Sequence, residues 1–195
     1  MQKVGTFLKK IVFAIVVFFV LFDLINIHYI KQYVQFHLFY KSAVGAVTTS
    51  SQKVEPNMLA IPSLDILAPI VYATASNETV FQADLKNGVV HYPGTADPGQ
   101  NGNCYIFGHS SDYIFSKGHY KTVLALLPNI KTGARIYVSD AQGNEFVYVV
   151  MQATIVSPTD VQYLKQDTAK KMLTVQTSYP VGTALNRFLA IATLQ

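Results

Sequence analysis

Apolar residues follow two different patterns along this chain of 195 residues. Residues 11–22 read IVFAIVVFFVLF, an unbroken apolar run that LINIHYI continues after Asp23. From Met58 onward the apolar residues instead form short runs rich in Val, Ile, Tyr, Phe and Thr, with turn residues between them. The first pattern is typical of a membrane-crossing helix of about 20 residues, and the second is typical of short β-strands.

The first run predicts a single transmembrane helix from about Thr6 to Ile30, with 1–30 forming the cytoplasmic tip and anchor. Lysines at positions 3, 9 and 10 precede it, which indicates a cytoplasmic N-terminus and an extracellular C-terminal domain. Asp23 is expected near the outer interface or facing a partner, because a carboxylate at the bilayer centre is costly. A cleaved signal peptide and a buried core helix are the alternatives, but no A-x-A-like site follows the apolar core directly.

Residues 31–57 are expected to form a stalk. KQYVQFHLFYK suits a membrane interface through its aromatic residues, and SAVGAVTTSSQKVEPN has the small, polar composition of a linker. His28, near the end of the expected anchor, and His37, in the stalk, are interpreted as interfacial polar residues without chemistry. The third part, residues 58–195, is expected to be a separate domain.

The pattern of this third part predicts an all-β fold, a small barrel or sandwich. YVSDAQGNEFVYV indicates a hairpin, with a turn-rich stretch between two alternating runs. Two short helices are also predicted. Asn77 would cap ETVFQADLK, with Gly88 just past its end, and YKTVLALL would form the second helix before Pro128.

Charge and composition exclude several classes of protein. The first 57 residues hold six lysines and two acidic residues, whereas residues 58–195 hold nine basic and nine acidic residues. A neutral domain with two arginines does not suit nucleic acid, which requires a basic patch. Cys104 is the single cysteine, so an internal disulfide and a multi-cysteine zinc site are excluded. No dense cluster of Asp and Glu suggests a calcium loop, so neither a metal nor a cofactor is expected.

Three residues are candidates for chemistry on the positions they occupy. His109 closes the apolar strand CYIFG and opens a polar loop, Ser178 ends KMLTVQTS, and Arg187 stands in the otherwise apolar NRFLAIATL. A guanidinium in such a strand needs a partner or an anionic ligand, since an unpaired buried charge is costly. His91 is expected to shape a turn-rich loop, and His119 to cap a helix or face solvent.

Three blocks of the chain resemble the sortase family of cell-surface cysteine transpeptidases, especially its compact class D and E types. They are LAIPSLDILAPIVYA (59–73), NGVVHYPGTADPGQNGNCYIFGHSS (87–111) and LTVQTSYPVGTALNRFLAIATL (173–194). The resemblance implies a closed β-barrel behind a single membrane anchor, with His109 as the catalytic histidine and Arg187 as the catalytic arginine. It also implies cleavage of sorting signals resembling Leu-Pro-x-Thr-Gly. The released acyl group would then join an amine acceptor of the cell envelope or a pilin.

Ser178 departs from the family's TLxTC pattern, because it stands where the nucleophilic cysteine is expected. Three interpretations of Ser178 are open: an engineered Cys→Ser change, a natural serine variant with slow acyl transfer or hydrolysis, or a catalytically dead peptide-binding module. In the second, Asp112 is the nearest acidic residue that could orient His109. Cys104 is not expected to substitute. It lies five residues before His109, so the two side chains would face opposite sides of a strand.

Overall fold

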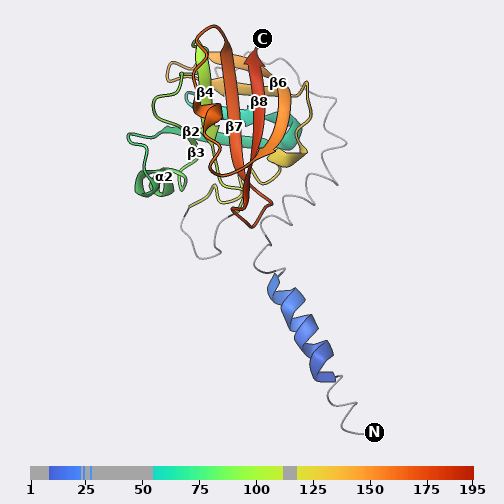
Figure 1. The fold of residues 1–195 in the computed structure, drawn as a ribbon. Helices are drawn as coiled ribbons and strands as arrows, with labels where there is room; N and C mark the ends of the chain where they lie inside the picture. The colour runs from blue at the N-terminus through green and yellow to red at the C-terminus, as the bar shows by residue number, and fades with distance from the viewer. Residues whose placement is uncertain (1–8, 23, 25–26, 28–54, 112–117) are drawn as a thin grey trace.

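A computed structural model describes residues 9–22, 24, 27, 55–111 and 118–195, and within these ranges the chain is a closed β-barrel (Figure 1). Its strands are β1 (Met58–Ile61), β2 (Ile66–Tyr72), β3 (Val89–His91), β4 (Gly102–Phe107), β5 (Arg135–Ser139), β6 (Glu145–Val156), β7 (Lys171–Tyr179) and β8 (Asn186–Leu194). They pair in the order β1-β2-β3-β4-β7-β8-β6-β5 and then close on β1. The all-β prediction is therefore confirmed, and of the two predicted architectures, barrel and sandwich, the chain forms the barrel.

The barrel core is built by alternation along each strand. In β7, Leu173 and Val175 are fully buried inside the barrel, and in β4 Cys104 and Ile106 join the same core. The residues between them face the outside, because side chains of a strand point alternately to its two faces. Every strand at this side of the barrel thus presents one face to the core and one outward.

The hairpin and the first helix agree with the sequence. Strands β5 and β6 pair up to Ser139 and Glu145, which lie opposite each other across the turn. Helix α2 (Glu78–Asp84) is capped by Asn77, whose side chain accepts a hydrogen bond from the backbone N–H of Val80 at 3.0 Å. Figure 1 shows α2 beside β2 and β3, outside the barrel.

The second predicted helix, YKTVLALL, is wrong in type. This stretch consists of turns that lead into a 3-10 helix, η3 (Leu127–Asn129). The N–H of Leu124 donates to the carbonyl of His109, which removes it from any helical ladder. Apolar residues 124–127 are all buried in the core, so this segment fills the barrel instead of presenting the single apolar face of an amphipathic helix.

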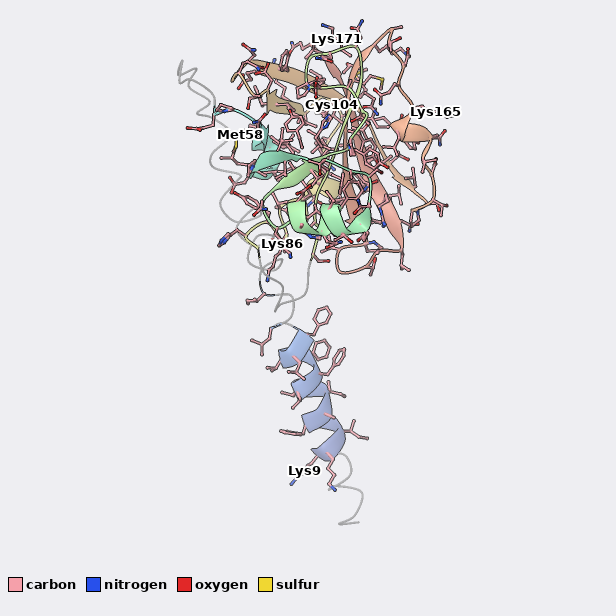
Figure 2. All side chains as sticks on the ribbon, turned by 90° about the vertical axis from the view of Figure 1, so that its left-hand side faces the viewer. Lys9, Met58, Lys86, Cys104, Lys165 and Lys171 are labelled. Carbon is pink, nitrogen blue, oxygen red and sulfur yellow. The ribbon has the colours of Figure 1, made fainter. Side chains whose placement is uncertain are left out.

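Two further 3-10 turns complete the described elements: η2 (Pro62–Leu64) between β1 and β2, and η4 (Gln162–Leu164) between β6 and β7. Residues 9–22 are helical with exposed side chains, and Lys9 near their start is labelled in Figure 2. Within the described part of the chain, none of the helices combines the length and apolar character that a bilayer crossing requires. The two ends of the span expected from Thr6 to Ile30 and a few positions within it lie outside the described residues, Asp23 and His28 among them, as does His37.

Candidate active site on the outer face of β4, β7 and β8

Three neighbouring strands bring the candidate residues to one level of the barrel. Strands β7 and β8 are antiparallel, and Ser178 lies directly opposite Arg187. Strands β4 and β7 are parallel, and their pairs differ by 69 in residue number up to Phe107 and Gln176. His109 stands two residues past the end of β4, and continuing the same offset past the strand would bring it level with Ser178. The sequence-predicted residues therefore occupy adjacent register positions, and the side chains of Ser178 and Arg187 share the outer face.

The backbone at His109 is held from both sides. The N–H of Gly108 donates to the carbonyl of Gln176 at 3.1 Å, and the Thr177 hydroxyl donates to the carbonyl of Gly108 at 3.0 Å. The carbonyl of His109 accepts from the N–H of Leu124 at 3.0 Å. The first two bonds extend the pairing of β4 with β7 past its last ladder pair, and the third holds the backbone at the half-buried His109 from the other side.

Gly108 is required by the packing beneath it. A Cβ atom at this position would lie 2.9 Å from side-chain carbons of both Leu124 and Val89. Real Cβ atoms essentially never make contacts this short, so a larger residue would shift either these two core side chains or the backbone that carries His109. Close packing against Leu124 and Val89 therefore explains why a glycine precedes His109.

Arg187 is half-buried, and its guanidinium is partly anchored to the adjacent loop. Its Nη1 donates to the carbonyl oxygens of Ala184 at 3.1 Å and Asn186 at 3.0 Å. Within the residues that the structure describes, the sole ion pair joins Lys170 to Asp167, so Arg187 has no described carboxylate within salt-bridge distance. Its positive charge is therefore available to an anionic group or a developing oxyanion.

The charge of Arg187 also reaches across β7 to β4. Burial raises the pKa of the Tyr105 phenol, and Arg187 opposes this by lowering that pKa. Tyr105 is 6% exposed, and its hydroxyl donates to Oε1 of Gln176 at 2.6 Å. Because β7 lies between β4 and β8, the charge of Arg187 acts across β7, the strand that carries Ser178 and Gln176.

Aromatic rings support the β4 side of this face. Phe107 packs edge-on against Phe81 of α2 with ring centroids 4.9 Å apart, and Tyr92 lies within 6.3 Å of both Tyr105 and Phe107. The Tyr92 hydroxyl bonds with the hydroxyl of Ser76 at 2.6 Å. Helix α2 thus holds the outer side chains of β4 from the side away from β7.

The β6–β7 segment (157–170) is fastened to the start of β4 by two amide side chains. Oε1 of Gln166 accepts from the N–H groups of Asn103 at 2.8 Å and Ala96 at 3.3 Å, while its Nε2 donates to the Asn103 carbonyl at 3.2 Å. Asn103 donates from Nδ2 to the Tyr163 carbonyl at 2.7 Å and accepts from the Thr174 hydroxyl at 3.0 Å. The segment therefore lies against the same outer face, below Ser178.

The other residues singled out by the sequence lie away from this level. Cys104 is 1% exposed in the inner core, and burial raises the pKa of its thiol. Figure 2 shows it among the side chains that fill the barrel. His91 is buried, and its Nε2 bonds to the carbonyl of Ala96 at 2.9 Å, which confirms a loop-shaping role. His119 is exposed. Asp112 lies outside the described residues.

Sequence reasoning missed Tyr105, Gln176, Asn103 and Gln166. Alternation offered a signal for the first three. Asn103 and Tyr105 share a face of β4, and Gln176 and Ser178 share a face of β7, so each polar side chain falls on the face opposite the core. Gln166 had no such signal, because its position depends on how the β6–β7 segment crosses the barrel.

Comparisons with known proteins agree on one family. A family model described as a sortase domain matches residues 59–195. Sortase D of Bacillus subtilis (strain 168) is 28% identical over 135 residues, which cover 68% of this chain and 60% of that protein. The match thus extends over less than two thirds of that relative's length.

Solved structures add the same result for the fold. A sortase D5 transpeptidase of Clostridium perfringens is 25% identical, with a TM-score of 0.58 over 71% of this chain and 77% of that one. Sortase C-1 of Actinomyces oris is 22% identical, with a TM-score of 0.60 over 84% of this chain and 85% of that one, and shows the likeness of fold alone.

Proposed function

Because the chain belongs to the sortase family, we propose that it acts on sorting signals resembling Leu-Pro-x-Thr-Gly and joins the cleaved protein to an amine acceptor. His109, Ser178 and Arg187 form the proposed site. The observation that carries this proposal is the direct pairing of Ser178 on β7 with Arg187 on β8, with His109 two residues past the end of β4 on the other side of β7. Ser178 and Arg187 share the outer face, and no described carboxylate lies within salt-bridge distance of the guanidinium.

The chemistry assigns one role to each position. The side chain at 178 attacks the threonine carbonyl, and the carbon–nitrogen bond to glycine breaks once the tetrahedral intermediate collapses. Arg187 stabilises the negative charge that develops on the carbonyl oxygen. His109 protonates the departing amine and then removes a proton from the incoming amine, whose attack releases the acyl group from residue 178.

Serine makes the first step the difficult one. A cysteine thiol titrates near 8.5 and is converted to thiolate more readily beside a cation. A serine hydroxyl is far less acidic and needs a base held in the correct tautomer. We therefore expect this chain to bind sorting signals and to transfer acyl groups slowly or not at all, whether Ser178 is engineered or natural.

The proposal also covers the location and partners of the protein. Residues 1–30 would anchor the chain in the membrane with the N-terminus inside, 31–57 would form a stalk, and 58–195 would act outside the cell. The lysines before the apolar run support this topology. Partners would be surface proteins that carry a sorting signal and an envelope or pilin amine.

A transfer assay with a restored nucleophile tests the proposal. The full chain, Ser178→Cys and Ser178→Ala are each incubated with a fluorogenic Leu-Pro-x-Thr-Gly peptide and an amine, and the ligated product is quantified by mass. Ser178→Cys should exceed both other chains strongly, with Ser178→Ala as the inert control. A Ser178→Cys chain that binds the peptide but forms no product would support the alternative, a catalytically dead peptide-binding module at the cell surface.

A further inference from the structure

The buried phenol of Tyr105 on β4 needs a hydrogen-bond partner, and Gln176 on the adjacent strand β7 supplies it. The Tyr105 side chain is 6% exposed, and a buried phenol that lacks a hydrogen-bond partner is costly. Oε1 of Gln176 is the acceptor, at 2.6 Å from the phenolic oxygen. This short bond occupies the oxygen end of the Gln176 amide and fixes the direction of the whole group.

The nitrogen end of the same amide is consequently directed away from Tyr105. Gln176 is half-buried, and its lateral neighbours on the outer face are Phe107 on β4 and Leu189 on β8. Neither has a polar side chain. No acceptor for Nε2 exists among the hydrogen bonds of the described residues, so its two N–H groups lie beside the site as an oriented donor.

Gln176 also has a defined distance from the reacting position. It precedes Ser178 by two residues on the same face of β7, which corresponds to about 6.5–7 Å along a strand. An extended peptide whose reacting carbonyl is at residue 178 would carry a neighbouring carbonyl over Gln176. The acyl part of the substrate stays bound through both half-reactions, whereas the leaving amine departs, so fixed contacts serve the acyl side.

We infer that Gln176 is a substrate-binding residue whose Nε2 donates a hydrogen bond to a carbonyl oxygen of the sorting signal, on the acyl side of the scissile bond. Tyr105 is the positioning residue that keeps the amide in this orientation. The inference rests on the proposed function, because it assumes that the peptide binds over β7. The hydrogen bond from Gln176 would be a polar contact to the peptide between two apolar neighbours, Phe107 and Leu189.

Kinetics in the Ser178→Cys chain separate this role from a structural one. Gln176→Leu should raise KM for the peptide by about 3- to 10-fold, the range of one neutral hydrogen bond, and leave KM for the amine acceptor unchanged. Tyr105→Phe should raise the peptide KM in the same direction. The double variant should be no worse than Gln176→Leu alone, because both changes remove the same contact.

A second measurement is independent of turnover. Binding of a labelled Leu-Pro-x-Thr-Gly peptide to the unsubstituted chain should weaken by the same 3- to 10-fold in Gln176→Leu. Gln152→Leu serves as the matched control, since Gln152 is an exposed glutamine on β6, and should bind normally. Thermal melting checks that each variant is folded.

The outcomes distinguish this inference from the proposed function. An active Ser178→Cys chain whose peptide KM is unchanged by Gln176→Leu overturns the inference and leaves the function standing. An inert Ser178→Cys chain whose peptide binding weakens in Gln176→Leu overturns the transfer reaction and supports the inference. Equal loss in Gln176→Leu and Gln152→Leu also overturns it.

Discussion

Ser178 and Arg187 are direct cross-strand partners of β7 and β8, so the hydroxyl and the guanidinium share one face of the barrel. Opposite residues of an antiparallel pair have Cβ atoms about 4.5–5.5 Å apart, a spacing that the long arginine side chain easily spans. The guanidinium is anchored by two carbonyls of the adjacent loop and has no described carboxylate partner. This arrangement suits stabilisation of charge that forms at residue 178.

Replacing Arg187 should therefore impair transfer without unfolding the protein. In the Ser178→Cys chain, Arg187→Ala should lower kcat/KM by about 10²- to 10³-fold, as for loss of an oxyanion donor. Arg187→Lys should recover only part, because it keeps the charge but not the planar fork. Arg135 is the other arginine of the chain and is exposed on β5, so Arg135→Ala is the matched control. Similar losses in both alanine variants would contradict the role of Arg187.

Cys104 should affect stability at alkaline pH and leave transfer unaffected. Burial raises the pKa of its thiol in the folded state, whereas the unfolded thiol titrates near 8.5. Above that pH the unfolded state releases a proton that the native state keeps, so stability falls as pH rises, by up to about 1.4 kcal/mol per unit. Urea unfolding from pH 7 to 10 should show a shallower decline for Cys104→Ala.

The same variant tests whether Cys104 has any catalytic part. In the Ser178→Cys chain, Cys104→Ala should change kcat by less than about twofold, because the thiol lies inside the barrel. Superimposed pH curves for the free energy of unfolding, or a large loss of kcat, would each contradict its assignment to the core.

The hydrogen bonds of the Asn103 and Gln166 side-chain amides should order the β6–β7 segment. Asn103→Ala would leave the buried Thr174 hydroxyl without its acceptor, at a cost of about 1–3 kcal/mol in unfolding free energy. Gln166→Ala should increase hydrogen exchange across 157–170, whereas Gln162→Ala, which removes a bond to Asp160 within the same segment, should have little effect. Equal exchange in both glutamine variants would argue against the fastening role of Gln166.

Much of the fold follows from local pattern. The β5–β6 hairpin and α2 were predicted because alternation, turn residues and an Asn77 cap act within a few residues of sequence. The stretch 120–127 was misassigned because its apolar residues suit a helix locally. Its actual form depends on the barrel interior and on a bond from Leu124 to His109, which are long-range.

In the candidate site too, some features follow from local sequence and others depend on long-range contacts. His109, Ser178 and Arg187 were selected because each stands at an unusual point of an apolar strand and matches a family block. Their common level could be derived only from the pairing of β4, β7 and β8, since parallel register is not encoded in either strand alone. The hydrogen bond between Tyr105 and Gln176 joins residues 71 apart in sequence, so it too could not be predicted from local pattern.

Gly108→Ala should destabilise the protein and displace His109. The added methyl group would meet Leu124 and Val89 in the packed core, at a cost of about 1–3 kcal/mol. In the Ser178→Cys chain we also expect a fall in kcat below the melting temperature. Ser111→Ala is the nearby control, because its hydroxyl accepts only an exposed bond from Gly182, and should change stability by about 0.5 kcal/mol or less. A Gly108→Ala chain with unchanged melting would contradict the packing argument.

The most direct test of the central claim is to locate the acyl group on the enzyme. Ser178→Cys is mixed with a Leu-Pro-x-Thr-Gly peptide without an amine acceptor, quenched in acid, digested and mapped by mass spectrometry. The expected result is a thioester on residue 178, absent from Ser178→Ala and lost when an amine is added. A chain that acquires no adduct, or acquires it at Cys104, would contradict the account.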